Sequence, residues 1–118
     1  MAANPVPLNP QMAIRIEKKA DQTVVHLSGR ITSTTSGDLQ NTIRSLIPET
    51  SRIVLDMAEV DYIDSSGIGA LVSVYLSASR VQCTLELANP QARIRDLFEV
   101  SKLTAVFENR GGYRGLGS

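Results

Sequence analysis

The chain has 118 residues, 42% of them hydrophobic and 20% charged, and its 12 basic residues balance its 12 acidic ones. This length suits a single domain with its own core, and the balanced charge gives no reason to expect binding to nucleic acid or an anionic membrane. The single cysteine, Cys83, is predicted to be a buried thiol and cannot form a disulfide within the chain. No apolar run approaches the roughly 20 residues that span a bilayer, so a cytoplasmic protein is expected.

The first residues are predicted to form a leader and a β-hairpin. Residues 1–11 contain three prolines and lack the features of a signal peptide, which favours a flexible leader. Residues 13–18 and 23–28 are predicted to be short strands joined by a turn, and Gly29 is expected to end the second strand. Because His26 is the only histidine, an exposed or hydrogen-bonded strand side chain is favoured over a catalytic or metal-binding one.

A helix and a central strand are predicted next. Hydroxyl residues at 33–36 offer several N-caps, and Pro48 is expected to stop the helix. Apolar residues recur between them at helical spacing, namely Leu39, Ile43, Leu46 and Ile47. Residues 52–57 contain an unbroken apolar run, which predicts a strand covered on both faces and therefore central in the sheet. An acidic turn through Glu59 and Asp61 is expected to follow.

The turn leads into the sequence Asp64-Ser65-Ser66-Gly67, which is expected to open a second helix. The apolar face of this helix is predicted from residues at helical spacing, namely Ile68, Leu71, Val72, Tyr75 and Leu76. Gly67 and Gly69 weaken the first turn of this helix. Because glycine has no side chain, these positions would allow the sheet or a partner to approach the helix closely.

The C-terminal part is predicted to hold a strand, a helix and a last short strand. Residues 83–88 alternate as a strand does, and Asn89-Pro90 is expected to start the helix that follows. The inner face of that helix is expected to hold Ile94, Leu97 and Phe98. A short strand is predicted at 103–107, and the glycine-rich tail at 109–118 is predicted to be loose.

The predicted order of elements is β-β-α-β-α-β-α-β. Two strands separated by a helix usually run parallel with a right-handed crossover, whereas the opening hairpin adds an antiparallel pair. We therefore predict an α/β fold with a mixed four- to five-stranded β-sheet and helices packed on it, forming one domain over residues 12–108.

The junction of strand and helix offers little for catalysis. Asp61 and Asp64 have no nearby Lys or His to complete a hydrolase or metal site. Ser65 lacks the Gly-x-Ser-x-Gly context of a nucleophile, and the chain has no glycine-rich phosphate-binding motif. We therefore predict no catalytic residue, no metal site and no enzymatic activity.

A modification site is the alternative at this junction. A phosphate on Ser65 would lie at a helix N-terminus, where unpaired N–H groups and the helix dipole favour anions. It would add a charge of roughly −1.5 to −2 beside the acidic residues Glu59, Asp61 and Asp64, and so oppose an acidic partner. From the residues alone, a simple N-cap at Ser65 or Ser66 is favoured over such a switch.

The same residues give the chain a resemblance to the STAS domain family, and within it to bacterial anti-sigma factor antagonists. The resemblance covers residues 13–107, and its most specific part is IVLDMAEVDYIDSSGIGALV, residues 53–72. Supporting matches are Leu27-Ser28-Gly29, Leu87-Ala88-Asn89-Pro90, and apolar positions from Ile94 to Leu103. The resemblance implies a single STAS-like domain.

The resemblance also implies a partner-switching function. In that family the unphosphorylated antagonist binds an anti-sigma factor that is a serine kinase, and a sigma factor is released. Phosphorylation of the serine that matches Ser65 abolishes binding, and a PP2C-type phosphatase resets the switch. ATP belongs to the kinase, so no cofactor is implied here, and the free protein is expected to be a monomer or weak dimer. The implied partner-binding residues are Asp64, Ser65, Ser66, Gly67, Ile68 and Thr32.

The chain departs from the family after the second strand. Many members have Gly-Glu-Leu-Asp where this chain has Gly29-Arg30-Ile31-Thr32, so Thr32 stands in place of an aspartate that often lies near the switch serine. This change bears on partner choice or phosphorylation. An alternative function is a non-enzymatic STAS scaffold or accessory subunit of a stress-sensing or transport complex; a small enzyme or nucleotide-binding module has the weakest support.

Overall fold

The computed structural model describes residues 11–100 and 113–114. The elements in chain order are β1 (Met12–Lys18), β2 (Thr23–Ile31), α1 (Ser36–Leu46), the 3₁₀ helix η1 (Ile47–Glu49), β3 (Arg52–Ile63), α2 (Ser65–Arg80), β4 (Thr84–Ala88), α3 (Ala92–Val100) and β5 (Tyr113–Arg114). The predicted order is confirmed as far as α3. The leader predicted at 1–11 lies, except for Gln11, outside the described residues, as does the strand predicted at 103–107. Among the described residues, β5 lies in the tail that was predicted to be loose and pairs with β4.

The five strands form one mixed sheet in the order β1-β2-β3-β4-β5. β1 and β2 form the predicted antiparallel hairpin, in which Lys19 N donates a hydrogen bond to Gln22 O at 2.8 Å. The pairs β2–β3, β3–β4 and β4–β5 are parallel. β3 is central, and Ile53, Val54 and Leu55 are all buried, as their unbroken apolar run predicted. The α/β prediction with a mixed sheet is therefore confirmed.

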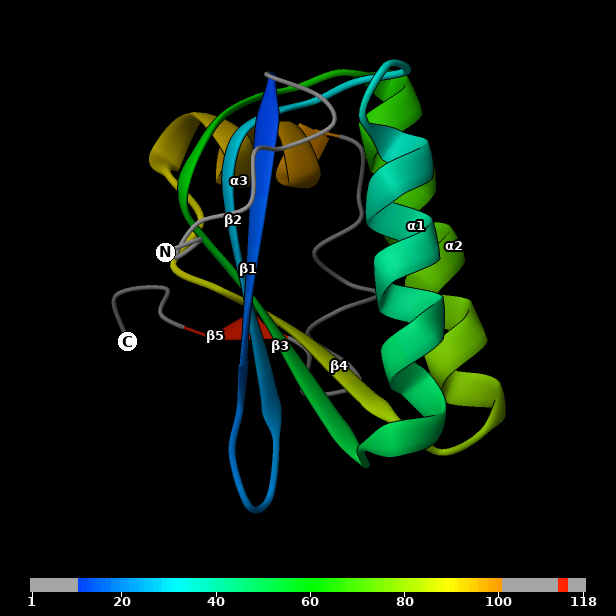
Figure 1. Cartoon of the computed structure of the whole chain (residues 1–118). Helices are drawn as coiled ribbons and strands as arrows, with labels where there is room; N and C mark the ends of the chain where they lie inside the picture. Colours follow the sequence, from blue (N-terminus) through cyan, green and yellow to red (C-terminus); the bar gives the residue numbers. More distant parts are fainter. Residues whose placement is uncertain (1–10, 101–112, 115–118) are drawn as a thin grey trace, which may run out of the picture.

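Helices α1 and α2 lie side by side against one face of the sheet (Figure 1). Their apolar residues form one core with the strands, and α3 adds Ile94 and Phe98 to it. α1 ends ahead of Pro48, which lies in η1, as predicted. Within the part of the chain that the structure describes, no helix is long and apolar enough to cross a membrane.

The second strand does not end at Gly29, as the sequence suggested, but continues to Ile31. Gly29 has φ of 100°, and the pairing of β2 with β3 shifts register between Gly29 and Arg30. A Cβ at Gly29 would overlap the carbonyl oxygen of Gln11, which accepts a hydrogen bond from Arg30 N at 2.9 Å. Glycine therefore allows an irregularity inside the strand instead of ending it.

The acidic turn predicted after Asp56 is also wrong, because β3 runs unbroken to Ile63. The parallel pairing with β2 shifts register twice, and each shift places one extra residue on β3. Buried side chains consequently recur at every third residue, at Met57, Val60 and Ile63, with exposed acidic residues between them. A pattern that departs from the usual two-residue period was mistaken for a turn.

The predicted inner face of α2 is only partly correct. Leu71 and Tyr75 are buried, but Leu76 is 46% exposed, and Ile68 and Val72 are half-buried. The remaining buried positions are Gly67, Ala70, Val74 and Ala78. Three of these four residues are small, so they let α2 lie close to the sheet, and a pattern that counts large apolar residues does not detect them.

The start of α3 differs from the prediction as well. Asn89 is not its N-cap, because the helix begins at Ala92 and Arg95 N donates to Gln91 O at 2.9 Å. Asn89 has φ of 57°, a left-handed conformation that asparagine tolerates better than most residues. Its side-chain amide points back toward β3 and donates to Asp56 Oδ1 at 3.5 Å.

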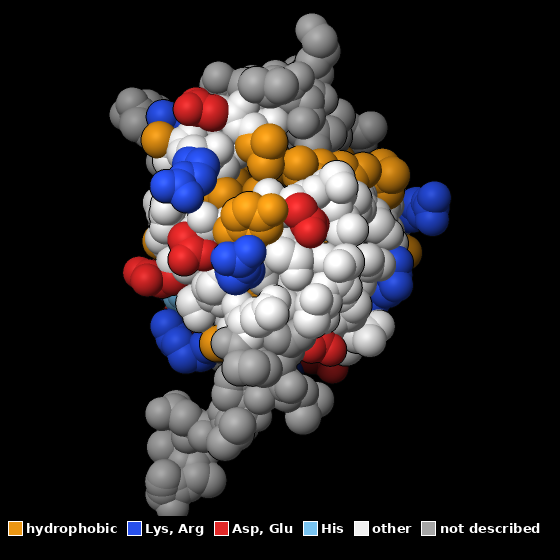
Figure 2. All heavy atoms as spheres, turned by 90° about the horizontal axis from the view of Figure 1, so that it is seen from above, with side chains coloured by type: hydrophobic (Ala, Val, Ile, Leu, Met, Phe, Trp, Pro, Cys, Tyr) orange, Lys and Arg blue, Asp and Glu red, His pale blue; other side chains and the backbone are white. Residues whose placement is uncertain are grey.

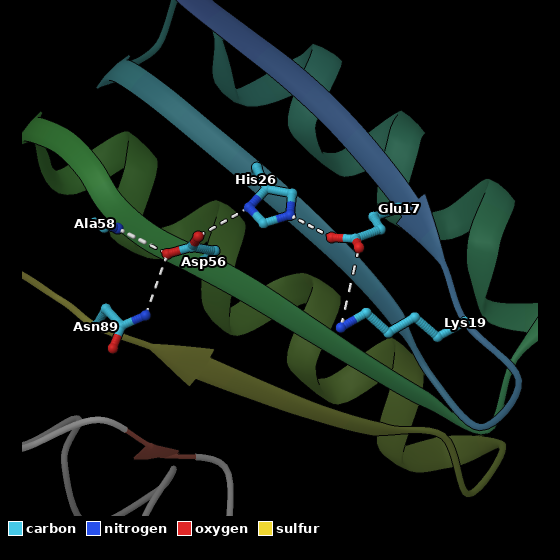
Figure 3. A network of polar contacts seen from close by, with 6 residues as sticks. All are labelled: Glu17, Lys19, His26, Asp56, Ala58 and Asn89. Carbon is cyan, nitrogen blue, oxygen red and sulfur yellow. Dashed lines mark hydrogen bonds and ion pairs between the residues drawn. The ribbon is translucent and has the colours of Figure 1, made fainter.

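On the sheet face away from α1 and α2, His26 bridges two neighbouring strands (Figure 3). Its Nδ1 lies 2.8 Å from Asp56 Oδ2 on β3, and its Nε2 lies 3.0 Å from Glu17 Oε1 on β1. Ala58 N also donates to Asp56, at 3.1 Å. The prediction of a hydrogen-bonded strand histidine is confirmed, and the contacts connect β1, β2 and β3.

The environment of Asp56 sets the direction of its pKa. Burial raises the pKa of this carboxyl, but hydrogen bonds from Ala58 N–H, His26 and Asn89, together with the attraction of His26, outweigh burial and hold the pKa below its usual value. The folded state therefore binds a proton at Asp56 less readily than the unfolded chain does. The resulting stabilisation is present above the unfolded pKa and is lost as pH falls through the folded pKa.

We predict that Asp56→Asn lowers the free energy of unfolding at neutral pH and that this deficit shrinks in acid. As pH falls through the lowered folded pKa, the wild-type carboxylate is itself protonated and loses its advantage. Urea denaturation of both proteins at intervals from about pH 6 to about pH 3 measures the difference. A deficit that stays constant over that range would contradict the assigned role of Asp56.

Candidate functional site

The strand-to-helix junction is built around Asp64. This residue has an extended backbone and is the N-cap of α2, and its Oδ1 accepts a hydrogen bond from Gly67 N at 3.0 Å. Ile68 N donates to Asp64 O at 2.9 Å, which starts the helical ladder. The interpretation in which Ser65 or Ser66 caps the helix is therefore wrong, because Asp64 occupies that position.

The two serines follow the cap as the first two residues of α2, and both are exposed. Neither hydroxyl has a hydrogen-bond partner among residues 11–100. The first backbone N–H groups of a helix have no partner within it and carry a partial positive charge. The arrangement can therefore accept an anion at Ser65 or Ser66 without breaking a hydrogen bond made by either side chain.

Gly67 fixes how closely α2 approaches the sheet. Asp64 N donates to Ile31 O at 3.2 Å, which brings the end of β2 beneath the helix start. A Cβ at residue 67 would overlap the same Ile31 oxygen and would lie 2.7 Å from Ile63 Cγ1. A Cβ at Gly69 would meet nothing within 4 Å. Close approach of the sheet, one of the two reasons expected for these glycines, therefore applies to Gly67.

The loop that follows β2 lies beside the junction and is organised by hydroxyl groups. Thr32 is buried, and its Oγ1 accepts from Thr34 N at 3.2 Å. Thr35 is the N-cap residue of α1, but its hydroxyl does not cap the helix. It accepts from Thr32 N at 2.9 Å and donates to Arg30 O at 2.8 Å. The geometry thus gives Thr32 a place inside the loop, and a direct contact with a partner stays a prediction.

An exposed pair beside the junction was not anticipated. The guanidinium of Arg30 lies 4.4 Å from the ring centroid of Tyr62, its neighbour across β2 and β3. Tyr62 is 40% exposed and precedes Asp64 by two residues. The departure from the family at Arg30 was the signal available in the sequence. Figure 2 views the end of the molecule at which α1 and α2 begin, and hydrophobic side chains gather there beside acidic and basic ones.

Reactive groups elsewhere do not form a second centre in the described part of the chain. Cys83 is buried, as predicted, and burial raises the pKa of its thiol, which disfavours the nucleophilic thiolate. Glu86 on β4 is buried, with Oε2 2.7 Å from Arg52 Nη2. Among residues 11–100 and 113–114, no group of three or more His, Cys, Asp or Glu side chains could hold a metal ion.

Comparison with known proteins adds a family match and named relatives. The STAS domain model matches residues 13–113. A Bordetella bronchiseptica protein provisionally named as the anti-sigma factor antagonist BtrV is 26% identical over 97 residues, which cover 81% of this chain and 84% of the relative. An anti-sigma-B factor antagonist of Listeria monocytogenes is 27% identical over 93 residues, which cover 78% of this chain and 82% of the relative.

Solved structures share the fold. The anti-sigma factor antagonist SpoIIAA in its unphosphorylated form aligns with a TM-score of 0.67 and 21% identity, over 84% of this chain and 97% of SpoIIAA. A sulfate transporter family protein from Wolinella succinogenes aligns with a TM-score of 0.70 and 19% identity, over 81% of this chain and 78% of that one.

We predict that Asp64→Ala lowers the free energy of unfolding by about 1 kcal/mol, because it removes the acceptor for Gly67 N–H. Asp64→Asn retains an acceptor oxygen and should recover most of that loss. Asp61→Ala, a nearby exposed aspartate, should change stability by less than about 0.5 kcal/mol. Denaturant unfolding of the three variants tests the assignment, which fails if Asp64→Ala is as stable as wild type.

We further predict opposite effects of alanine at two neighbouring glycines. Gly67→Ala should lower the free energy of unfolding by about 2 kcal/mol or more, since the new Cβ must displace the backbone of β2. Gly69→Ala meets open space and should raise it by up to about 1 kcal/mol through helix propensity. Thermal and urea unfolding measure both changes. Equal effects of the two substitutions would contradict the close approach at Gly67.

Proposed function

Since the chain belongs to the STAS domain family, we propose that it is an anti-sigma factor antagonist that switches partners through phosphorylation of Ser65. The named relatives support the general role. The observation that carries the specific role is the position of Ser65, an exposed hydroxyl at the start of α2 with its capping task taken by Asp64. In this proposed role the chain binds other proteins and acts in the cytoplasm.

The proposed partner is an anti-sigma factor with serine kinase activity, as the family resemblance implies. The unphosphorylated chain binds this kinase and so frees the sigma factor. The kinase then transfers the γ-phosphoryl group of ATP to Oγ of Ser65, with release of ADP and of the hydroxyl proton. A PP2C-type phosphatase hydrolyses the phosphoserine, which returns serine and inorganic phosphate.

Electrostatics support a switch that leaves the fold intact. A phosphate at Ser65 would lie at the N-terminus of α2, where the helix dipole and free N–H groups favour it. Exposed carboxylates at Glu59 and Asp61 already make the nearby surface partly acidic. The added charge of roughly −1.5 to −2 would oppose an acidic partner surface or remove a hydrogen bond to the hydroxyl. Binding would then be lost while the helix cap at Asp64 remains in place.

A second candidate is a STAS scaffold or accessory subunit. The similarity of fold to a sulfate transporter family protein supports this second candidate. The intact Asp64-Ser65-Ser66-Gly67 sequence, with both hydroxyls exposed, favours the switch instead. A constitutive subunit would bind its partners with equal affinity whether or not Ser65 carries a phosphate.

We predict that incubation with the cognate anti-sigma factor kinase and ATP places phosphate on Ser65. Wild type and Ser66→Ala should be labelled and Ser65→Ala should not, as mass spectrometry of the tryptic peptides can establish. Ser65→Asp should weaken binding to the kinase about 100-fold or more by calorimetry, since it places a charge at the interface. Its melting temperature should stay close to that of wild type. Phosphate found only on another residue would refute the assignment of Ser65.

A further inference from the structure

β1 forms an edge of the sheet, with β2 as its neighbour. Backbone hydrogen bonds at the two ends of the hairpin, from Arg30 N to Gln11 O and from Lys19 N to Gln22 O, show which residues of β1 face β2. Because hydrogen-bonded pairs alternate along an antiparallel ladder, the odd-numbered residues of β1 direct their N–H and C=O groups to β2. The even-numbered residues direct theirs outward, where a further strand can pair with them.

Ile16 lies in the middle of this outward-facing row. Its side chain is 43% exposed, whereas Ile14, two residues before it, is half-buried against the core. An exposed β-branched residue on an unpaired edge favours pairing with another strand. Arg15 and Glu17 flank Ile16 and are exposed on the opposite face of β1. A strand that pairs with β1 must place compatible charges opposite these two side chains.

The order of these charges suits a second copy of β1. If two copies pair antiparallel about a two-fold axis at Ile16, each Ile16 lies opposite the other, and Arg15 of each copy lies opposite Glu17 of the other. An axis at Arg15 would oppose two arginines, and an axis at Glu17 would oppose two glutamates. Charge complementarity therefore favours the axis at Ile16 over these two neighbouring axes, and in that register Ile16 forms a hydrogen-bonded pair, as its outward backbone groups require.

We propose that a second copy of this chain docks on the β1 edge in this register, which joins the two sheets into one continuous sheet. Glu17 can serve both contacts: its Oε1 lies 3.0 Å from His26 Nε2, while its Oε2 is only loosely held, 4.0 Å from Lys19 Nζ. Arg15 of the second copy would bind Oε2. Lys18, opposite Ile14 of the second copy, covers that side chain with its aliphatic stem.

The proposed interface is separate from the phosphorylation site. Ile16 pairs with Val25, and Val25 pairs with Leu55, whereas the junction follows the far end of the same strands, where Ile31 pairs with Ile63. Dimerisation thus leaves Ser65 accessible. The inference does not depend on the proposed function, and the failure of either one leaves the other standing.

Sedimentation equilibrium of the full chain from about 1 μM to about 1 mM tests the proposal. Wild type should show a reversible monomer–dimer equilibrium. Arg15→Glu and Glu17→Arg should each weaken self-association about tenfold or more, since each turns two opposite-charge contacts into like-charge contacts. Arg80→Glu, which reverses an exposed charge at the end of α2, should leave the equilibrium unchanged.

Mixing the two single variants supplies the matched control. Position 15 of one variant then lies opposite position 17 of the other with opposite charges in both contacts, so an equimolar mixture should regain wild-type affinity. The double variant Arg15→Glu with Glu17→Arg should also self-associate. Circular dichroism checks that each monomer is folded. The proposal is refuted if wild type stays monomeric throughout, if folded single variants associate as wild type does, or if the mixture fails to associate.

Discussion

The start of α2 lies against the end of β2 so closely that residue 67 has no room for a side chain. Asp64 N donates to Ile31 O, and the Asp64 carboxylate accepts from Gly67 N. The first contact joins the helix start to the sheet through backbone groups on both sides, and the second caps the helix. Ser65 is consequently positioned by the fold, and a charge added there alters the surface without requiring the backbone to move.

The register shifts between β2 and β3 determine which residues lie near Ser65. β3 continues through both register shifts, so exposed carboxylates at Glu59 and Asp61 lie along the strand up to the junction. Because β2 and β3 are parallel, their carboxyl ends meet at one edge of the sheet, and Arg30 lies there against Tyr62. The end of the molecule at which α2 begins therefore combines acidic, basic and aromatic groups, as suits a surface that binds another protein.

Polar groups on the sheet face opposite the helices have a different role. His26 links Glu17 to Asp56, and Arg52 pairs with the buried Glu86, so neighbouring strands are joined by charged contacts. In the second pair Glu86 is buried and Arg52 is partly exposed, so its desolvation offsets much of the attraction and it is a weak source of net stability. These residues connect strands and need no functional explanation.

Local patterns in the sequence were sufficient to predict the order of the elements, the opening hairpin, the central position of β3 and a helix starting at the Asp64 junction. Each of these depends on the spacing of apolar residues or on neighbours a few positions apart. Tertiary structure alone decided that β2 continues past Gly29, that β3 contains no turn and that small residues form the inner face of α2. The reason is that these features depend on strand pairing and on contacts such as that of Gly67 with Ile31, between residues far apart in the chain.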